Sequence, residues 1–208
     1  MITTIYFIRH SIPFKEHRGI NKTNEPLQIE NEKSPLSIAG EKLAYECAKE
    51  EEFQNLDIVF SSNYVRAMST AKYFAYNNNL KVNIDERFNE RKHGVNSYNE
   101  LPSDFETRQF EDEDYKLGDG ESQKEVRTRE YNALMEVINE NKGKTIAIVS
   151  HSTAMAFLFS TWCDVKYDGN YTFKGKPFFN GHWNYVETFK LEFDDENNLV
   201  NIENIIRN

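Results

Sequence analysis

The chain has 208 residues, of which 38% are hydrophobic and 13% aromatic, enough for one large domain or for a core with a cap. Its 34 acidic residues outnumber its 25 basic residues and give a formal net charge of -9. This balance argues against a nucleic-acid partner, which would require a basic face.

The first apolar run is interrupted by Arg9 and His10, unlike that of a signal peptide. No run approaches the roughly 20 apolar residues of a membrane span. We therefore expect a cytoplasmic protein without a membrane partner. Cys47 and Cys163 fall in separate predicted helices, so we expect buried free thiols rather than a disulfide or a metal pair.

Strand-like and helix-like segments alternate along the chain. Runs rich in Ile, Val and aromatic residues predict strands, and apolar residues at helical spacing predict helices. In chain order we expect a strand at 2–9, a helix at 37–53, a strand at 56–60, a helix from about 63, a short strand at 80–84, a helix at 121–141, a strand at 145–149, a helix at 152–162, and strands at about 185–193 and 199–206. This order predicts an α/β fold, a three-layer αβα sandwich with a mainly parallel sheet and helices on both faces.

Two long segments do not fit the alternation. Residues 11–34 are polar without a clear period, and residues 95–120 are acidic and aromatic. Loops of this length in a compact domain are usually functional or disordered. We therefore expect one domain over residues 1–208, in which these segments form the walls and a small helical or loop cap of a site, with the cap insertion at about 95–120.

His10 and His151 each follow a predicted buried strand, and each is followed at once by a serine. In a parallel sheet both histidines leave at the carboxyl edge, where ligands bind in open α/β sheets. Arg9 precedes His10, and an arginine fork binds two phosphate oxygens at once. These residues predict an anion site, for phosphate above all.

Three further motifs are ambiguous when each is taken alone. Arg66 lies in the first turn of a helix, where it would bind an anion or point into solvent. Glu90 lies among basic residues, where it would act as a general acid or form a surface ion pair. Ser122 follows a glycine-rich turn, where it would cap a helix or donate to an oxyanion.

Taken together and in order, these motifs resemble those of the histidine phosphatase superfamily, which includes the cofactor-dependent phosphoglycerate mutases. Each block alone is weakly specific, whereas six blocks in register over residues 2 to about 160 are strongly specific. The blocks are Arg9-His10, Pro35-Leu36-Ser37-Ile38-Ala39-Gly40, Ser61-Ser62-x-x-x-Arg66-Ala67-x-x-Thr70-Ala71, Phe88-x-Glu90-x-x-x-Gly94, Gly120-Glu121-Ser122 and Val149-Ser150-His151.

The resemblance implies a role for each catalytic position. His10 would be the nucleophile that becomes phosphohistidine, and Glu90 would protonate the leaving alkoxide and then assist water. Arg9, Arg66 and His151 would hold the transferring phosphoryl oxygens. The implied chemistry needs no metal and no cofactor.

The chain departs from the family pattern at the residues after both histidines. Ser11 and Ser152 stand where the family has glycine, and we expect both serines to contact the substrate. The polar pattern that commonly follows the first motif is absent, and Arg18 or Asn21 would supply the missing contact.

The preferred function is that of a phosphomonoesterase acting on a small phosphorylated metabolite. A phosphoglycerate mutase-type phosphoryl transfer is the first alternative, because Asn89 and Arg91 around the acid are typical of mutases. The segment between Glu90 and His151 is short for a mutase, however, and an acidic run at 111–114 would repel a multiply phosphorylated substrate unless it faces water. An inactive binding module of the same fold and a metal hydrolase are further alternatives, and a homodimer is left open.

Overall fold

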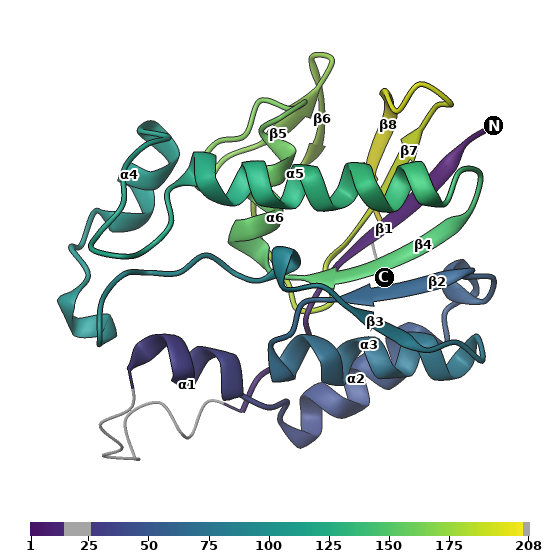
Figure 1. Ribbon diagram of the computed structural model, residues 1–208, viewed down its shortest axis with the longest axis horizontal. Helices are drawn as coiled ribbons and strands as arrows, with labels where there is room; N and C mark the ends of the chain where they lie inside the picture. Colours follow the sequence, from purple (N-terminus) through teal and green to yellow (C-terminus); the bar gives the residue numbers. More distant parts are fainter. Residues whose placement is uncertain (15–25, 206–208) are drawn as a thin grey trace.

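A six-stranded sheet lies at the centre of the molecule in the computed structural model, which describes residues 1–14 and 26–205 (Figure 1). The strand order is β3 (Val82–Ile84), β2 (Ile58–Ser61), β4 (Thr145–Ser150), β1 (Thr3–Arg9), β7 (Thr188–Phe193) and β8 (Leu199–Asn204). The first four strands in this order are parallel. Strand β7 pairs antiparallel with β1, and β8 pairs antiparallel with β7. The predicted mainly parallel sheet is therefore confirmed.

Helices cover both faces of this sheet, which confirms the predicted three layers (Figure 1). One face carries α2 (Ile38–Ala48) and α3 (Val65–Asn77), and the other carries α5 (Gln123–Glu140) and α6 (Ser152–Phe159). Each face has its own buried apolar cluster. The parallel centre of the sheet is therefore buried on both sides, as parallel sheets require.

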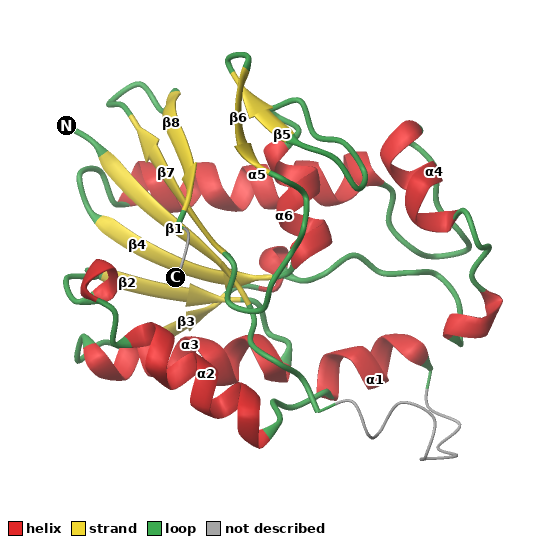
Figure 2. Cartoon of the chain, turned by 180° about the vertical axis from the view of Figure 1, so that it is seen from behind, coloured by secondary structure: helices red, strands yellow, loops and turns green. Residues whose placement is uncertain are grey.

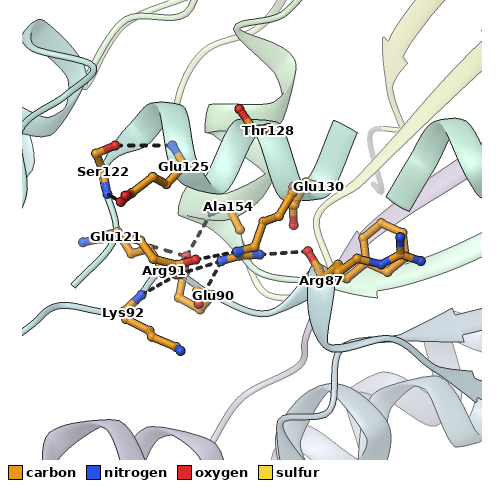
Figure 3. Close-up of polar contacts among 12 residues, drawn as sticks. Arg87, Glu90, Arg91, Lys92, Glu121, Ser122, Glu125, Thr128, Glu130 and Ala154 are labelled. Atoms are coloured by element: carbon orange, nitrogen blue, oxygen red, sulfur yellow. Dashed lines mark hydrogen bonds and ion pairs between the residues drawn. The ribbon is translucent and has the colours of Figure 1, made fainter. Parts of the chain in front are cut away.

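Two of these helices begin at serines whose side chains satisfy free backbone N–H groups. The Ser37 hydroxyl accepts a hydrogen bond from the Gly40 N–H at the start of α2. Ser122 and Glu125 exchange hydrogen bonds in a capping box at the start of α5 (Figure 3). Such caps fix where each helix begins and each contributes about 1 kcal/mol.

Gly40 explains how the chain after β1 packs against α2. A Cβ atom at this position would lie 2.1 Å from the carbonyl oxygen of Ile12, so only glycine permits this approach. The Gly40 carbonyl in turn accepts a hydrogen bond from the Ser11 hydroxyl. The Pro-Leu-Ser-Ile-Ala-Gly block thus anchors the segment that leaves the strand end carrying His10.

Several short elements were not predicted from the sequence. They are α1 (Leu27–Lys33), α4 (Phe105–Glu111), the β5–β6 hairpin (Tyr171–Phe173 and Lys176–Phe179), and 3-10 turns at Glu86–Phe88 and Tyr98–Glu100, whereas a third 3-10 turn at Glu51–Phe53 lies within the predicted helix at 37–53. Each is seven residues or shorter, so its own hydrogen bonds stabilise it little and tertiary contacts determine whether it forms. Two predicted helices also end early, α2 at Ala48 and α6 at Phe159.

The segment at 95–120 extends past the carboxyl ends of the parallel strands, together with α1 (Figures 1 and 2). The Tyr98 hydroxyl donates to the Asn31 side chain and so joins this segment to α1. Phe110 packs on Phe157 of α6. The long segment therefore packs on the body of the domain at the edge where the histidines emerge.

Two smaller expectations concern the cysteines and the membrane. Cys47 and Cys163 are buried free thiols, as predicted. No helix in the described part of the chain is long and apolar enough to cross a membrane.

Candidate active site

The two histidines meet at the carboxyl ends of neighbouring parallel strands. Arg9 at the end of β1 is in register with Ser150 at the end of β4, so the next residue of each strand is a histidine. The ring centroids of His10 and His151 are 5.1 Å apart, and both side chains are buried. The sequence prediction that the sheet brings these imidazoles together agrees with this geometry.

The hydrogen bonds of His10 determine which ring nitrogen carries the lone pair. Nδ1 lies 2.7 Å from the Ser11 carbonyl oxygen, which only accepts, so Nδ1 carries the proton. Nε2 accepts a hydrogen bond of 3.1 Å from Nε of Arg66. The imidazole therefore presents an Nε2 lone pair, the state required of a nitrogen nucleophile.

Arg66 connects both histidines to the cap side of the site. It lies in the first turn of α3 and is 4% exposed. Besides Nε2 of His10, its guanidinium donates to Nδ1 of His151 over 3.2 Å and to the backbone carbonyl of Asn31 in α1. This buried geometry contradicts the alternative of a solvated surface arginine.

His151 is held in the neutral state. Because its Nδ1 accepts from Arg66, its Nε2 carries the proton and donates to the Ser62 hydroxyl over 2.8 Å. Burial lowers the pKa of His151 well below 6.5, and the nearby positive charge of Arg66 lowers it further. The site thus contains two neutral imidazoles between arginines.

Arg9 contributes a buried cation to the same pocket. Its Nη1 donates to the Trp183 carbonyl over 2.8 Å, and its guanidinium carbon lies 4.6 Å from the ring centre of Tyr185. Burial lowers the pKa of Arg9. Its Nε is buried without an acceptor among the described residues. An unsatisfied buried N–H costs free energy, and an anionic ligand would satisfy it.

Glu90 accepts hydrogen bonds from the start of α6. Its Oε1 accepts from the N–H groups of Ala154 and Arg91, both at 3.0 Å (Figure 3). Its Oε2 accepts from the Thr153 N–H at 3.4 Å. Oε1 is therefore well satisfied and Oε2 only weakly. Since Glu90 lines the pocket, Oε2 is the oxygen better placed to exchange a proton.

A cavity of about 210 Å³ is lined by Arg9, His10, Arg66 and Glu90, whereas His151 lies behind it and is fully buried. The lining of the cavity consists of Arg9, His10, Pro13, Asn31, Arg66, Glu90, Arg91, His93, Tyr98, Glu106, Ser152 and Tyr185. A larger cavity of about 660 Å³ also touches Tyr185, but none of its described lining residues is Lys or Arg. Because Arg9, Arg66 and Arg91 line the smaller cavity beside His10, the smaller cavity is the one suited to bind an anion.

The predicted substrate-binding residues fall into three groups. Ser152 lines the cavity, as expected of a contact residue. Ser11 is fully buried outside the lining, and its hydroxyl donates to the Gly40 carbonyl. Arg18 and Asn21 lie outside the described residues. Ser122, for which an oxyanion contact was an alternative, caps α5 instead.

Several cavity residues were not assigned from the sequence. Arg91 is 4% exposed, pairs with Glu106 of α4, and has a buried Nε without an acceptor among the described residues. Tyr98 and Asn31 form the contact between the cap and α1. Arg91 could have been identified from the sequence because it directly follows Glu90. Glu106 could not, because its segment has no regular pattern of apolar residues.

The acidic run at 111–114 does not face the cavity. All four residues are exposed. Glu113 pairs with Arg127, and Asp114 pairs with Lys124, both on α5. The run therefore provides no argument against a substrate that carries more than one phosphate. Among the described residues no group of three or more His, Cys, Asp or Glu side chains is arranged to hold a metal ion.

Comparison with known families gives a match along nearly the whole chain. The family model described as "Histidine phosphatase superfamily (branch 1)" matches residues 5–197. Phosphoserine phosphatase 1 of Hydrogenobacter thermophilus is 32% identical over 133 residues, which are 60% of this chain and 62% of that protein. A probable phosphoglycerate mutase of Salmonella arizonae is 27% identical over 165 residues, 76% of this chain and 73% of that one.

Solved structures share the fold at lower identity. A mycobacterial glucosyl-3-phosphoglycerate phosphatase superposes with a TM-score of 0.71 and 16% identity, over 99% of this chain and 98% of the other. A phosphoserine phosphatase variant from Entamoeba histolytica, solved with phosphoserine, gives a TM-score of 0.65 and 17% identity, over 97% and 96% of the two chains. These likenesses support the three-layer fold.

Proposed function

We propose that this chain, which belongs to the histidine phosphatase superfamily, is a phosphomonoesterase that hydrolyses a small phosphorylated metabolite through a phosphohistidine at His10. One observation carries the proposal. The Nε2 lone pair of His10 lies against Arg66, in a cavity where Arg9 keeps a buried N–H donor without an acceptor among the described residues. A nucleophile between two arginines, one of which keeps an unsatisfied N–H, is suited to a phosphoryl group.

In the first half-reaction, the Nε2 lone pair of His10 attacks phosphorus and the P–O bond to the leaving group breaks. Arg9 and Arg66 bind the equatorial oxygens, where charge accumulates in the transition state. Oε2 of Glu90 gives its proton to the leaving oxygen, so the product departs as a neutral alcohol. Glu90 remains as a carboxylate beside the N–H groups of α6.

In the second half-reaction, water attacks the phosphohistidine. The Glu90 carboxylate takes a proton from this water as its oxygen bonds to phosphorus, and the P–N bond breaks. The electron pair of that bond returns to Nε2 of His10. Inorganic phosphate is released, and the carboxyl group again carries the proton that the next cycle requires.

The charge needed for this chemistry comes from side chains. Arg9 and Arg66, which bind the equatorial oxygens, both line the cavity, so we propose a reaction that needs no metal ion. Chelator treatment tests this point: turnover should persist after dialysis against EDTA. Loss of turnover that is restored by a divalent cation would favour the metal-hydrolase alternative.

The cavity indicates a small leaving group with polar substituents. Its volume of about 210 Å³ holds a phosphoryl group and a few further atoms. Arg91 and Glu106 line the cap side, and together they offer one cationic and one anionic contact. The relatives named as phosphoserine and glucosyl-3-phosphoglycerate phosphatases support a phosphorylated metabolite that carries a further charged group.

The decisive experiment combines phosphate release with trapping of the intermediate. The purified protein is offered p-nitrophenyl phosphate and a panel of phosphorylated metabolites, and inorganic phosphate is measured. Acid-labile, base-stable label from ³²P-substrate should appear on His10. His10→Ala should be nearly inert and unlabelled, and an active His10→Ala protein would overturn the mechanism.

A phosphoglycerate mutase is the alternative that a relative supports, since the Salmonella arizonae protein is named as a probable one. A mutase would return the phosphoryl group to an organic acceptor instead of water. Conversion of 3-phosphoglycerate to 2-phosphoglycerate faster than phosphate release would favour it. An inactive binding module would show neither reaction. The cytoplasmic location and a homodimer remain predictions.

A further inference from the structure

A fully buried carboxyl group lies behind the active site and is not used by the proposed mechanism. Glu130 of α5 is 0% exposed. Its Oε2 has no hydrogen-bond partner among the described residues, and its Oε1 lies 3.1 Å from the Ser150 hydroxyl. Ser150 immediately precedes His151, so this carboxyl group contacts the strand end that carries the histidine beside His10.

The Ser150 hydroxyl has one proton and two oxygen neighbours. Its oxygen lies 2.9 Å from the Phe88 carbonyl and 3.1 Å from Oε1 of Glu130. A carbonyl oxygen only accepts, so the serine proton must go to Phe88 if that hydrogen bond forms. The contact between Ser150 and Glu130 is then a hydrogen bond only if Glu130 donates. In that arrangement Glu130 carries a proton.

We propose that Glu130 is a positioning residue, which as a neutral acid donates to Ser150 and thereby directs the serine proton to the Phe88 carbonyl. This chain of two hydrogen bonds joins α5 to β4 and to the turn before Glu90. It fixes the spacing between the segment that carries Glu90 and the strand end that carries His151. The inference rests on the proposed function, because Glu90 is its acid and His151 packs beside its nucleophile His10.

Burial supports the neutral form of Glu130. It is the largest cause of the raised pKa of this carboxyl group; Arg129 on the same helix and the hydrogen bond with Ser150 lower that pKa, and Glu90 and Glu121 raise it. Arg129, however, donates to Glu121 and to the carbonyls of Arg87 and Glu90, so its donors are directed away from Glu130. Figure 3 shows Glu130 on the helix above the Glu90 and Glu121 carboxylates. Burial raises the pKa of Glu130 to about 8.

Ionisation of Glu130 would reverse the chain of hydrogen bonds. A carboxylate only accepts, so the Ser150 proton would turn toward Glu130 and the Phe88 carbonyl would lose its donor. The turn before Glu90 would then be held less firmly against β4. Misplacement of an acid by about 1 Å lowers turnover as much as about 10²-fold. We therefore expect turnover to fall as Glu130 ionises.

The test compares the full-length protein with Glu130→Gln, Glu130→Met and Glu140→Gln. Glutamine keeps a donor at every pH, methionine has none, and Glu140 is an exposed residue on the same helix that controls for loss of charge. The readouts are kcat and KM for p-nitrophenyl phosphate from pH 5.5 to 9.5, and the infrared carbonyl band of a protonated carboxyl group at pH 6.5.

The wild-type protein and Glu140→Gln should lose kcat above about pH 8, approaching tenfold per pH unit for a one-proton step. Glu130→Gln should keep its turnover there and lack the infrared band. Glu130→Met should lower kcat about 10-fold to 100-fold at every pH, with little change in KM.

Three results would overturn the inference. The first is a wild-type spectrum without the band, and the second is an unchanged alkaline limb in Glu130→Gln. The third is a Glu130→Met protein with wild-type kcat. If Glu130→Met does not fold, the pH profile of Glu130→Gln is the test. The band reports protonation whether or not the chain hydrolyses phosphoesters. A wild-type protein with the band but without turnover or phosphohistidine would therefore refute the proposed function and, with it, the positioning role, while Glu130 would still be neutral.

Discussion

Arg66 donates from Nε to Nε2 of His10, the nitrogen that we propose as the nucleophile, over a distance of 3.1 Å. The opposite ring nitrogen donates to the Ser11 carbonyl, so the imidazole is held from both sides in one tautomer and one orientation. When a phosphoryl group enters, its oxygens would replace the imidazole as the acceptor for Arg66. One guanidinium then orients the nucleophile before the reaction and binds the phosphoryl group during it.

Replacement of Arg66 should therefore affect both the nucleophile and the charge of the site. Loss of one preorganised donor typically costs about 10²–10³ in kcat, so we expect at least this loss for Arg66→Ala. Arg66→Lys should recover only part of it, because one ammonium cannot reach His10, His151 and the Asn31 carbonyl together. Pre-steady-state formation of phosphohistidine measures the effect, and a fully active Arg66→Lys protein would contradict it.

The sequence predicted the elements whose pattern of apolar residues follows directly from their burial in the core. Strands at the centre of the sheet are apolar on both faces, and their positions follow from that pattern. His10 and His151 could be placed together because parallel strands end at one edge. Arg66 and Glu90 gained a role only from the order of all six motifs, since neither is distinctive alone.

The remaining features depend on tertiary contacts that no local pattern encodes. Helix α4 is seven residues long, and Glu106 enters the cavity from it to pair with Arg91. The β5–β6 hairpin contributes Tyr171 and Phe179 to the core next to Trp183, an arrangement without a signal in residues 160–184. Glu130 is also fully buried, which its residue type does not indicate, because glutamate is rarely fully buried.

Gly94 should be irreplaceable for reasons of space. Its φ is +73°, and an added Cβ would lie 1.8 Å from the Leu117 carbonyl oxygen and 2.5 Å from the Gly120 nitrogen. Gly175 has a similar φ of +77° with nothing within 4 Å, and it serves as the control. We expect Gly175→Ala to cost about 1 kcal/mol and Gly94→Ala about 3 kcal/mol or more in urea unfolding. If both substitutions lower the free energy of unfolding equally, the close contacts around Gly94 do not add to the cost of its positive φ.

His151 should make the folded state sensitive to acid. Its pKa is lowered well below 6.5 in the folded protein, so below about pH 6.5 the unfolded chain binds a proton that the native state does not. Stability is then present above that pH and declines as the pH falls, by up to about 1.4 kcal/mol per pH unit. Glu130, whose pKa is raised to about 8, has the opposite slope between about pH 4.5 and 8.

The wild-type stability curve alone therefore cannot isolate His151. The measurement is the difference in unfolding free energy between the wild-type protein and His151→Asn, taken from pH 7.5 down to 5. The stability advantage of the wild-type protein should shrink steadily below about pH 6.5. A difference that stays constant with pH would show that His151 takes up a proton in the folded state.

Arg91 and its partner Glu106 should decide which leaving groups are accepted. Arg91→Lys removes the planar donor fork, and we expect kcat/KM for phosphorylated metabolites with a second anionic group to fall about 10-fold to 100-fold. Turnover of p-nitrophenyl phosphate, which lacks that group, should change far less. Arg108→Lys is the matched control, because Arg108 stacks on Tyr115 in the same cap and does not line the cavity. Equal losses on both substrates would show that Arg91 acts on the phosphoryl group instead.

The role of Glu90 as the acid can be tested through the leaving group. Glu90→Gln keeps a side-chain oxygen to accept the Ala154 and Arg91 N–H groups, so the start of α6 should stay intact. The amide has no acidic proton, so hydrolysis of alkyl phosphates should fall about 10²–10⁴-fold. The burst of p-nitrophenol, whose oxygen leaves without protonation, should fall much less. Dephosphorylation should slow for both substrates, because the Glu90 carboxylate also activates water. If the burst slows equally for good and poor leaving groups, Glu90 is not the acid. Glu106 then becomes the candidate in preference to Glu100 or Asp104, because it is the other carboxylate among the described residues that line the cavity.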